Sequence, residues 1–232
     1  MRETVIPRPE AATVAVEGSS ARFPVRRIYC VGRNYAEHAR EMGDSGREPP
    51  FFFAKPADAV LSVSDGAEGV LPYPPLTQDL HHEVELVAAL GSGGRDLTPD
   101  QAAACIWGYA IGLDMTRRDL QGAAKKAGRP WETGKAFDHS APIGPLHPAA
   151  SAGAMAKGAI TLSVNGQQRQ SGDLSDMIWS VPEAIAALSR SVTLRPGDLL
   201  FTGTPAGVAA LARGDRLAGT IDGIGRVDTT IL

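Results

Sequence analysis

The sequence predicts an α+β fold in which β-sheet dominates. Many apolar runs are short and bounded by turn-forming residues, as in strands joined by turns, and only a few segments carry helix start signals. The chain also lacks a GxGxxG motif after a strand, a P-loop and a GxSxG elbow. Nucleotide binding and serine-hydrolase chemistry therefore have no support in the sequence.

Length, composition and charge are those of an ordinary globular protein. At 232 residues, with 43% hydrophobic and 21% charged residues, the chain can bury the core of a single domain. Its net charge of -3 argues against nucleic acid or an anionic membrane surface as a partner. An apolar leader and a bilayer-spanning stretch are both missing, so we expect a cytoplasmic protein with Cys30 and Cys105 as buried thiols.

The N-terminal part is expected to contain strands, one short helix and a loop. Residues 1–26 have weak periodicity and predict an arm or an edge strand laid on the body. Residues 28–31 predict a strand, 35–42 a helix that ends at a glycine, and 44–50 a polar loop rich in chain-breaking residues. A buried strand is expected to start at 51–53.

Two longer apolar strands are expected in the middle of the chain. They cover residues 82–90 and 105–113, and a short helix begins at Thr98 between them. A helix is predicted from Met115 to about Gly128, where a glycine and a proline would end it.

The C-terminal part predicts mostly β-structure. Asn165 and Gly166 separate two strand-like segments and are a strong signal for a two-residue hairpin turn. Ser180 and Glu183 have the spacing of a capping box, which predicts a helix through Arg190. The remaining residues are expected to form turns and short strands.

Two carboxylates in one of the apolar strands are the most informative feature of the chain. Glu83 and Glu85 would project from the same face of the strand, about 7 Å apart, and repel each other in an apolar setting. A hard divalent cation (Mg²⁺, Mn²⁺ or Ca²⁺) would offset that repulsion, and Asp114 at the end of the next apolar run could be a third ligand. The alternative is a surface strand with alternating carboxylates. His81 and His82 fit packing or secondary positions better than ligation of such an ion.

Three further motifs could carry chemistry. His38 and Glu41 lie three residues apart on the predicted helix 35–42, where a carboxylate could orient an imidazole as a general base; an incidental ion pair is the alternative. Lys135 sits in an apolar context and requires an anionic partner if buried. The loop 202–207 could hold a carboxylate with its amides and hydroxyls, or be an ordinary turn.

The order of these motifs resembles the fumarylacetoacetate hydrolase family. The match runs from about residue 27 to the C-terminus and consists of 30–35, 81–86, 113–121, 134–137, 164–166 and 201–207, together with His38 and Glu41. Because the motifs occur in the family's order, the resemblance is more specific than any one of them. It is strongest to the short acylpyruvase branch, and especially to its members that cleave fumarylpyruvate.

The resemblance implies a family-type α+β fold with layered mixed β-sheets and a few short helices, usually in a homodimer. Residues 27–232 would be the catalytic domain, and 1–26 would be an arm without an assigned function. The resemblance also implies a Mg²⁺ or Mn²⁺ site with three protein carboxylates, Glu83, Glu85 and Asp114.

The activity implied by the resemblance is cleavage of the carbon–carbon bond of an acylpyruvate, with fumarylpyruvate as the best candidate. The ion would hold the 2-oxo acid end and stabilise the pyruvate enolate. His38, oriented by Glu41, would activate water on a lid that orders when ligand binds, and Lys135 and Gln121 would stabilise the oxyanion.

Further residues would bind the 2-oxo acid substrate. Arg118 and Thr204 would hold its oxygens, and Arg33 matches the motif with a less defined role. For the far carboxylate of fumarylpyruvate, Arg33, Arg117 and Arg129 are unranked candidates. The alternatives are a decarboxylase or isomerase on the same scaffold and, in a different class, a non-catalytic metal- or ligand-binding protein.

Overall fold

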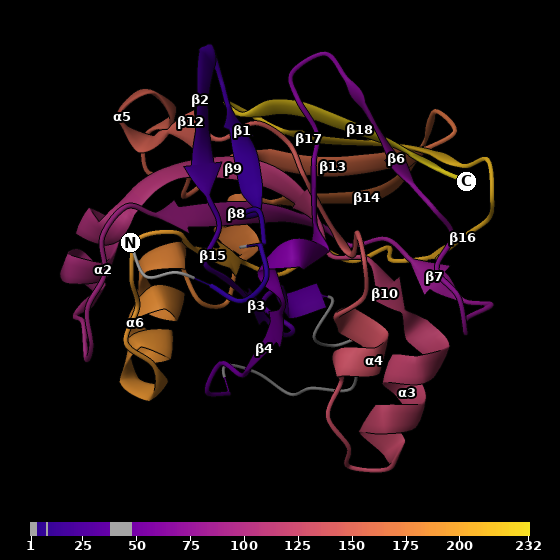
Figure 1. Cartoon of the computed structure of the whole chain (residues 1–232), viewed down its shortest axis with the longest axis horizontal. Coiled ribbons are helices and arrows are strands. Elements are labelled where there is room, and N and C mark those ends of the chain that lie inside the picture. Colours follow the sequence, from indigo (N-terminus) through magenta and orange to yellow (C-terminus); the bar gives the residue numbers. More distant parts are fainter. Residues whose placement is uncertain (1–3, 8, 38–47) are drawn as a thin grey trace.

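The centre of the fold is an antiparallel ladder between β8 (Val84–Leu90) and β9 (Ile106–Leu113), shown in Figure 1. The computed structural model describes residues 4–7, 9–37 and 48–232, and every statement below concerns these residues. All seven residues of β8 are buried. The strand therefore has other parts of the protein on both faces, which explains its continuous apolar sequence.

The ladder belongs to an eight-stranded mixed sheet. Its order is β4-β3-β15-β8-β9-β11-β5, with β12 also paired to β9. The pairs β3–β15 and β5–β11 are parallel, and β8 is antiparallel to both neighbours. The other strands are β3 (Arg27–Val31), β4 (Phe52–Lys55), β5 (Val60–Ser62), β11 (Ala141–Ile143), β12 (His147–Pro148) and β15 (Asp198–Phe201).

A five-stranded sheet of order β14-β13-β17-β18-β6 packs against β8 and β9 (Figure 1). Its strands are β6 (Glu68–Leu71), β13 (Ala159–Val164), β14 (Gln167–Asp173), β17 (Arg216–Ile221) and β18 (Gly225–Ile231). Asn165 and Gly166 join β13 to β14 with φ angles of 52° and 76°. The predicted hairpin is confirmed, since both turn residues adopt the positive φ that such a turn requires.

Two small sheets complete the β-structure. One contains β7 (Leu80–His81), β10 (Thr116–Arg117) and β16 (Ala210–Leu211). The other is a hairpin of β1 (Thr13–Val16) and β2 (Ser19–Pro24). Val14 and Phe23 of this hairpin are buried in the core, so this part of the expected arm packs on the body.

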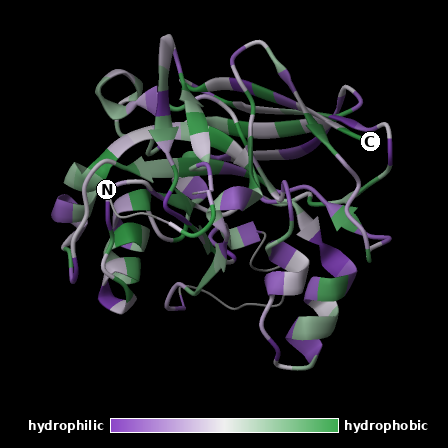
Figure 2. Ribbon diagram, viewed as in Figure 1, coloured by the Kyte–Doolittle hydropathy of each residue, from purple (hydrophilic) through white to green (hydrophobic). Residues whose placement is uncertain are grey.

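The helices are short and few. They are α2 (Pro99–Cys105), α3 (Arg118–Lys126), α4 (Glu132–Lys135), α5 (Ala149–Ala152) and α6 (Val181–Ser191), with 3₁₀ turns η1 (Ala57–Ala59) and η2 (Leu174–Asp176). Figure 2 shows α3 and α4 as largely hydrophilic, whereas α6 carries more hydrophobic residues. Within the described ranges, no helix is long and apolar enough to cross a membrane. The sheet-dominated α+β class is confirmed.

Some predicted boundaries were wrong. The helix expected from Met115 begins at Arg118, because Thr116 and Arg117 pair with β7 instead. The strand expected from residue 82 begins at Val84, and Cys105 ends α2 instead of starting β9. The helix at Val181 and the two buried free thiols are as predicted. Most of the predicted helix 35–42 lies outside the described residues.

Strand alternation places two cores on opposite faces of the large sheet. Val84, Leu86 and Ala88 of β8 face the core shared with the five-stranded sheet. Val87 and Ala89 face the core closed by the N-terminal hairpin. Because successive side chains of a strand point to opposite faces, Glu85 shares the face of Val87, beyond the end of the apolar core. The candidate site is built on this face.

Candidate active site

Three buried carboxylates gather where β8 and β9 meet. Glu83 precedes β8, Glu85 is its second residue, and Asp114 follows β9. One oxygen from each lies within 4.8 Å of the others. The neighbouring strands hold them together, since Glu85 pairs with Gly112 and Asp114 N–H donates to Glu83 O at 2.8 Å. The structure thus brings together the three residues that the sequence singles out as metal ligands.

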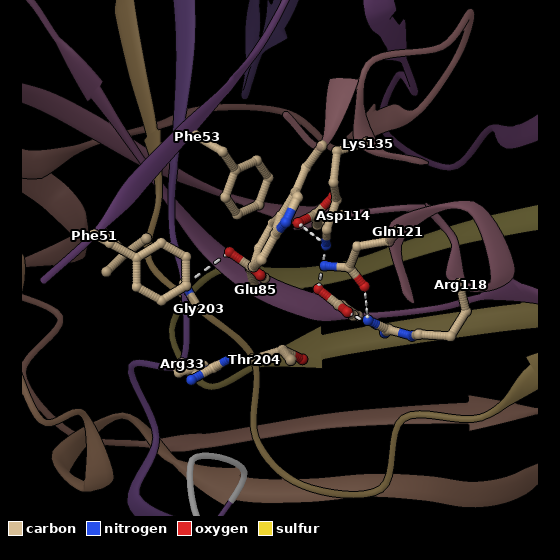
Figure 3. A pocket seen from close by; sticks show the side chains of 14 residues that line it. Arg33, Phe51, Phe53, Glu85, Asp114, Arg118, Gln121, Lys135, Gly203 and Thr204 are labelled. Atoms are coloured by element: carbon tan, nitrogen blue, oxygen red, sulfur yellow. Dashed lines mark hydrogen bonds and ion pairs between the residues drawn. The ribbon is translucent and has the colours of Figure 1, made fainter. Parts of the chain in front are cut away.

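Among the described residues, three cationic side chains contact these carboxylates. Lys135 Nζ donates to Glu83 Oε2 at 2.8 Å and to Asp114 Oδ2 at 2.7 Å. Arg118 donates to Glu83 Oε1, and its Nη1 donates to Gln121 Oε1 at 2.5 Å (Figure 3). Lys55 Nζ lies 2.8 Å from Asp114 Oδ1 in an ion pair without hydrogen-bond geometry. Glu83 and Asp114 are therefore paired with positive charge in the protein alone.

The pKa of Glu85 lies well above its ordinary value. Burial is the largest cause, followed by the negative charges of Asp114 and Glu83. Gly203 N–H partly offsets this by donating to Glu85 Oε2 at 2.7 Å. Gly203 has a φ of 96°, and a Cβ there would lie 2.7 Å from Asn34 Cβ. A glycine is required where this amide approaches the carboxylate.

Lys135 remains an ammonium group although it is buried. Burial lowers its pKa, but the charges of Asp114 and Glu83 more than compensate, and the net pKa is raised. The ammonium also lies 4.9 Å from the centroid of the Phe53 ring. The expectation that a buried lysine at this position requires an anionic partner is confirmed.

A cavity of about 30 Å³ opens between the carboxylates and an aromatic wall (Figure 3). The enclosed part alone admits one or two water-sized groups, and the empty space is about 390 Å³ when the part open to solvent is included. Its lining includes every described residue that was predicted to bind the metal, the oxyanion or the 2-oxo acid. The lining residues are Val31, Gly32, Arg33, Phe51, Phe53, Glu83, Glu85, Asp114, Arg118, Gln121, Trp131, Lys135, Gly203 and Thr204.

The hydroxyl of Thr204 makes two hydrogen bonds within the protein. Thr204 Oγ1 donates to Val84 O at 2.8 Å and accepts from Gln170 Nε2 at 2.7 Å. Because a hydroxyl has one hydrogen to donate, a substrate oxygen would have to be bound by another group, such as the backbone N–H. Gln170 also accepts from Val84 N–H and hydrogen bonds His82 Nδ1, so it joins the acidic strand to the loop 202–207.

Several site residues were missed by sequence reasoning. Phe51 and Phe53 were interpreted only as part of a buried strand, and neither Lys55 nor Trp131 was assigned a role in the site. A signal was available, because Phe53 and Lys55 share one face of β4 and Phe51, directly before the strand, continues the same alternation.

The other candidate residues fall outside the pocket or outside the described chain. Arg117 donates to Thr133 O at 3.3 Å and lies 4.4 Å from the centroid of the Phe137 ring. Neither Arg117 nor Arg129 lines the cavity. His38 and Glu41 lie outside the described residues.

Comparison with known proteins decides the family. Residues 27–232 match the model of the fumarylacetoacetate (FAA) hydrolase C-terminal domain. The chain belongs to the fumarylacetoacetate hydrolase family. The resemblance seen in the sequence is thereby confirmed over the segment where it was expected.

Family members similar to this chain carry names for different activities. A fumarylpyruvate hydrolase of Ralstonia sp. is 44% identical, over 81% of this chain and 95% of that protein. An oxaloacetate tautomerase of Escherichia coli K12 is 43% identical, over 89% of this chain and 93% of that protein. The crystal structure of fumarylpyruvate hydrolase from Pseudomonas aeruginosa in complex with Mn²⁺ and pyruvate is 54% identical, covers 99% of both chains and has a TM-score of 0.97.

Proposed function

We propose that this protein is a divalent-metal-dependent hydrolase that cleaves an acylpyruvate, with fumarylpyruvate the best candidate. The observation that carries the proposal is the group of three buried carboxylate oxygens within 4.8 Å, beside a buried lysine in a pocket. The similarity to a fumarylpyruvate hydrolase solved with Mn²⁺ and pyruvate supports it. A homodimer in the cytoplasm stays a prediction.

The donor set fits a hard divalent ion. Glu83, Glu85 and Asp114 would hold Mg²⁺ or Mn²⁺, because these ions prefer oxygen ligands and tolerate open positions. When bound, the ion would supply positive charge that orients the 2-oxo acid and stabilises the enolate as it forms. The raised pKa of Glu85 supports this fit, since a nearby dication would favour the ionised carboxylate.

The protein's own residues would carry the proton and oxyanion chemistry. The C4 carbonyl of the acylpyruvate would accept hydrogen bonds from Lys135 Nζ and the Gln121 amide as water attacks it. His38, oriented by Glu41, would take the proton of that water. Cleavage of the C3–C4 bond leaves its electron pair on C3, and protonation of C3 completes pyruvate. The hydroxyl from water remains on C4 as part of the released acid.

Arg118 and the Thr204 amide are the proposed partners of the 2-oxo acid carboxylate. Arg118 is hydrogen-bonded to Glu83, Gln121 and His81 in this structure. Because a guanidinium group has five N–H donors, it could keep these partners and still donate to a substrate carboxylate. The hydroxyl of Thr204 is excluded as a donor by its bond to Val84 O.

Metal removal tests the proposal. Protein treated with EDTA should lose cleavage of fumarylpyruvate, measured as the loss of its enol absorbance, and Mg²⁺ or Mn²⁺ should restore the rate. Untreated protein carried through the same dialysis without chelator is the control. Full activity in metal-free buffer would contradict the proposed function.

Oxaloacetate tautomerisation is a second candidate, favoured by the 43% identity to a tautomerase. Moving a proton between C3 and the 2-oxo oxygen requires no attacking water. His38→Ala should therefore reduce acylpyruvate hydrolysis about 10²- to 10⁴-fold, the usual contribution of a general base, while sparing tautomerisation. Equal rates of hydrolysis in variant and wild type would remove His38 from the mechanism. A protein that turns over neither substrate would be a binding protein.

A further inference from the structure

Part of the pocket wall consists of aromatic side chains that the folded core does not use. Phe51 is 38% exposed, and neither Phe51 nor Trp131 belongs to the two core clusters. The centroid of the Trp131 ring lies 5.5 Å from that of Phe51, edge to face, and 5.8 Å from that of Phe53. Leaving large aromatic surfaces open to solvent is unfavourable, so a wall of this kind at a pocket is typical of a ligand site.

Gly32 fixes the position of the Phe51 ring, which lies against its backbone. A Cβ on Gly32 would lie 2.0 Å from Phe51 Cζ, so only glycine leaves room for the ring. Gly32 N–H donates to Phe51 O at 3.1 Å. The residue directly after β3 therefore lies against the far end of the Phe51 ring. Figure 3 shows Phe51 and Phe53 near Glu85.

A guanidinium group lies next to this wall. Arg33 Cζ is 5.6 Å from the centroid of the Phe51 ring, and Arg33 lines the same cavity as the carboxylates. Arg117 and Arg129 do not line it. A guanidinium group can pair with a carboxylate through two parallel hydrogen bonds. The pocket thus offers an acidic group for a metal, aromatic faces and the guanidinium group of Arg33.

Building on the proposed function, we propose that Phe51, Trp131 and Arg33 form the acyl subsite. Its ligand class is a flat, conjugated acyl chain that ends in a carboxylate. The aromatic faces would stack on the planar chain, and Arg33 would pair with its terminal carboxylate. Oxaloacetate has no acyl chain to lie against the aromatic faces, so the subsite favours the longer acylpyruvates.

Three substrates separate the parts of this proposal. Fumarylpyruvate has a flat conjugated chain with a terminal carboxylate, succinylpyruvate has the same length and charge without the double bond, and acetylpyruvate has neither chain nor second carboxylate. The intrinsic reactivities of the three differ. The informative quantity is therefore the change in the ratio of their kcat/KM values when a side chain is replaced.

Trp131→Leu and Phe51→Leu should each lower the fumarylpyruvate-to-succinylpyruvate ratio about 2- to 12-fold, which is the range of an aromatic contact. The change should be in KM more than in kcat. Trp107→Leu is the matched control, because Trp107 packs against Phe23 of the N-terminal hairpin, outside the pocket, and should leave the ratio unchanged.

Arg33→Met should lower kcat/KM for both dicarboxylic substrates relative to acetylpyruvate, about ten- to hundredfold for a charge-assisted hydrogen bond. Equal losses for all three substrates in the Phe51, Trp131 and Arg33 variants would overturn the acyl subsite and leave the proposed function standing. A folded wild type that cleaves none of the three with Mn²⁺ would overturn the proposed function and the subsite with it.

Discussion

Lys55→Met should destabilise the metal-free protein strongly. Lys55 is completely buried, and its ammonium group lies 2.8 Å from Asp114 Oδ1. It also donates to Met115 O at 3.2 Å and to Lys135 O. Methionine has a similar length but no charge, so the change removes one partner of a buried ion pair and leaves two carbonyl groups without this donor.

The expected loss in the free energy of unfolding is about 3–5 kcal/mol, the usual cost of leaving a buried charge without its partner. The whole free energy of unfolding of such a domain is about 5–15 kcal/mol, so the loss is a large share of it and can be measured. A bound divalent ion would place positive charge beside Asp114. The loss should therefore be smaller in Mn²⁺-loaded protein than in protein treated with EDTA.

The assay is urea denaturation of both variants, followed by fluorescence, with and without Mn²⁺. Lys157→Met removes an exposed lysine and is the control, expected to change stability by no more than about 0.5 kcal/mol. A loss below about 1 kcal/mol for Lys55→Met in metal-free protein would refute the reasoning. Such a result would mean that Lys135 alone compensates Asp114.

Two further substitutions test the site. Glu85→Gln should weaken Mn²⁺ binding, measured by calorimetry, because it removes one carboxylate ligand. The same change should stabilise the metal-free protein at neutral pH, because burial, then Asp114 and Glu83, raise the pKa of Glu85 above 4.5 and disfavour its ionised form in the folded state. Wild-type metal-free stability should accordingly fall as pH rises from 4.5 through the higher pKa of the folded state, and a variant that shows the same fall would contradict this assignment. Gly203→Ala should lower the free energy of unfolding by about 1–3 kcal/mol, because the φ of 96° disfavours a side chain and the new Cβ would meet Asn34. An unchanged melting temperature in thermal unfolding would exclude that conflict.

Local features of the fold were predictable because they depend on a few neighbouring residues. The turn at Asn165 and Gly166 requires positive φ, and the capping box at Ser180 uses residues three apart. Predicted helix and strand boundaries were wrong where a segment distant in the sequence pairs with the residues at the boundary. Thr116 and Arg117 are compatible with a helix, but their pairing with β7 delays α3 to Arg118.

The sequence by itself predicted that Glu83 and Glu85 point the same way, because side chains alternate along extended backbone regardless of what surrounds it. Their oxygens do converge, although β8 begins only at Val84. Together with the order of the family motifs, this alternation was sufficient to predict the acidic group. Only the tertiary structure decided that Lys55 meets Asp114, that the Thr204 hydroxyl is committed to Val84, and that Arg33 reaches the pocket whereas Arg117 does not. These outcomes depend on strand register and on which segments pack together. Such contacts join residues far apart in the chain, and no local pattern specifies them.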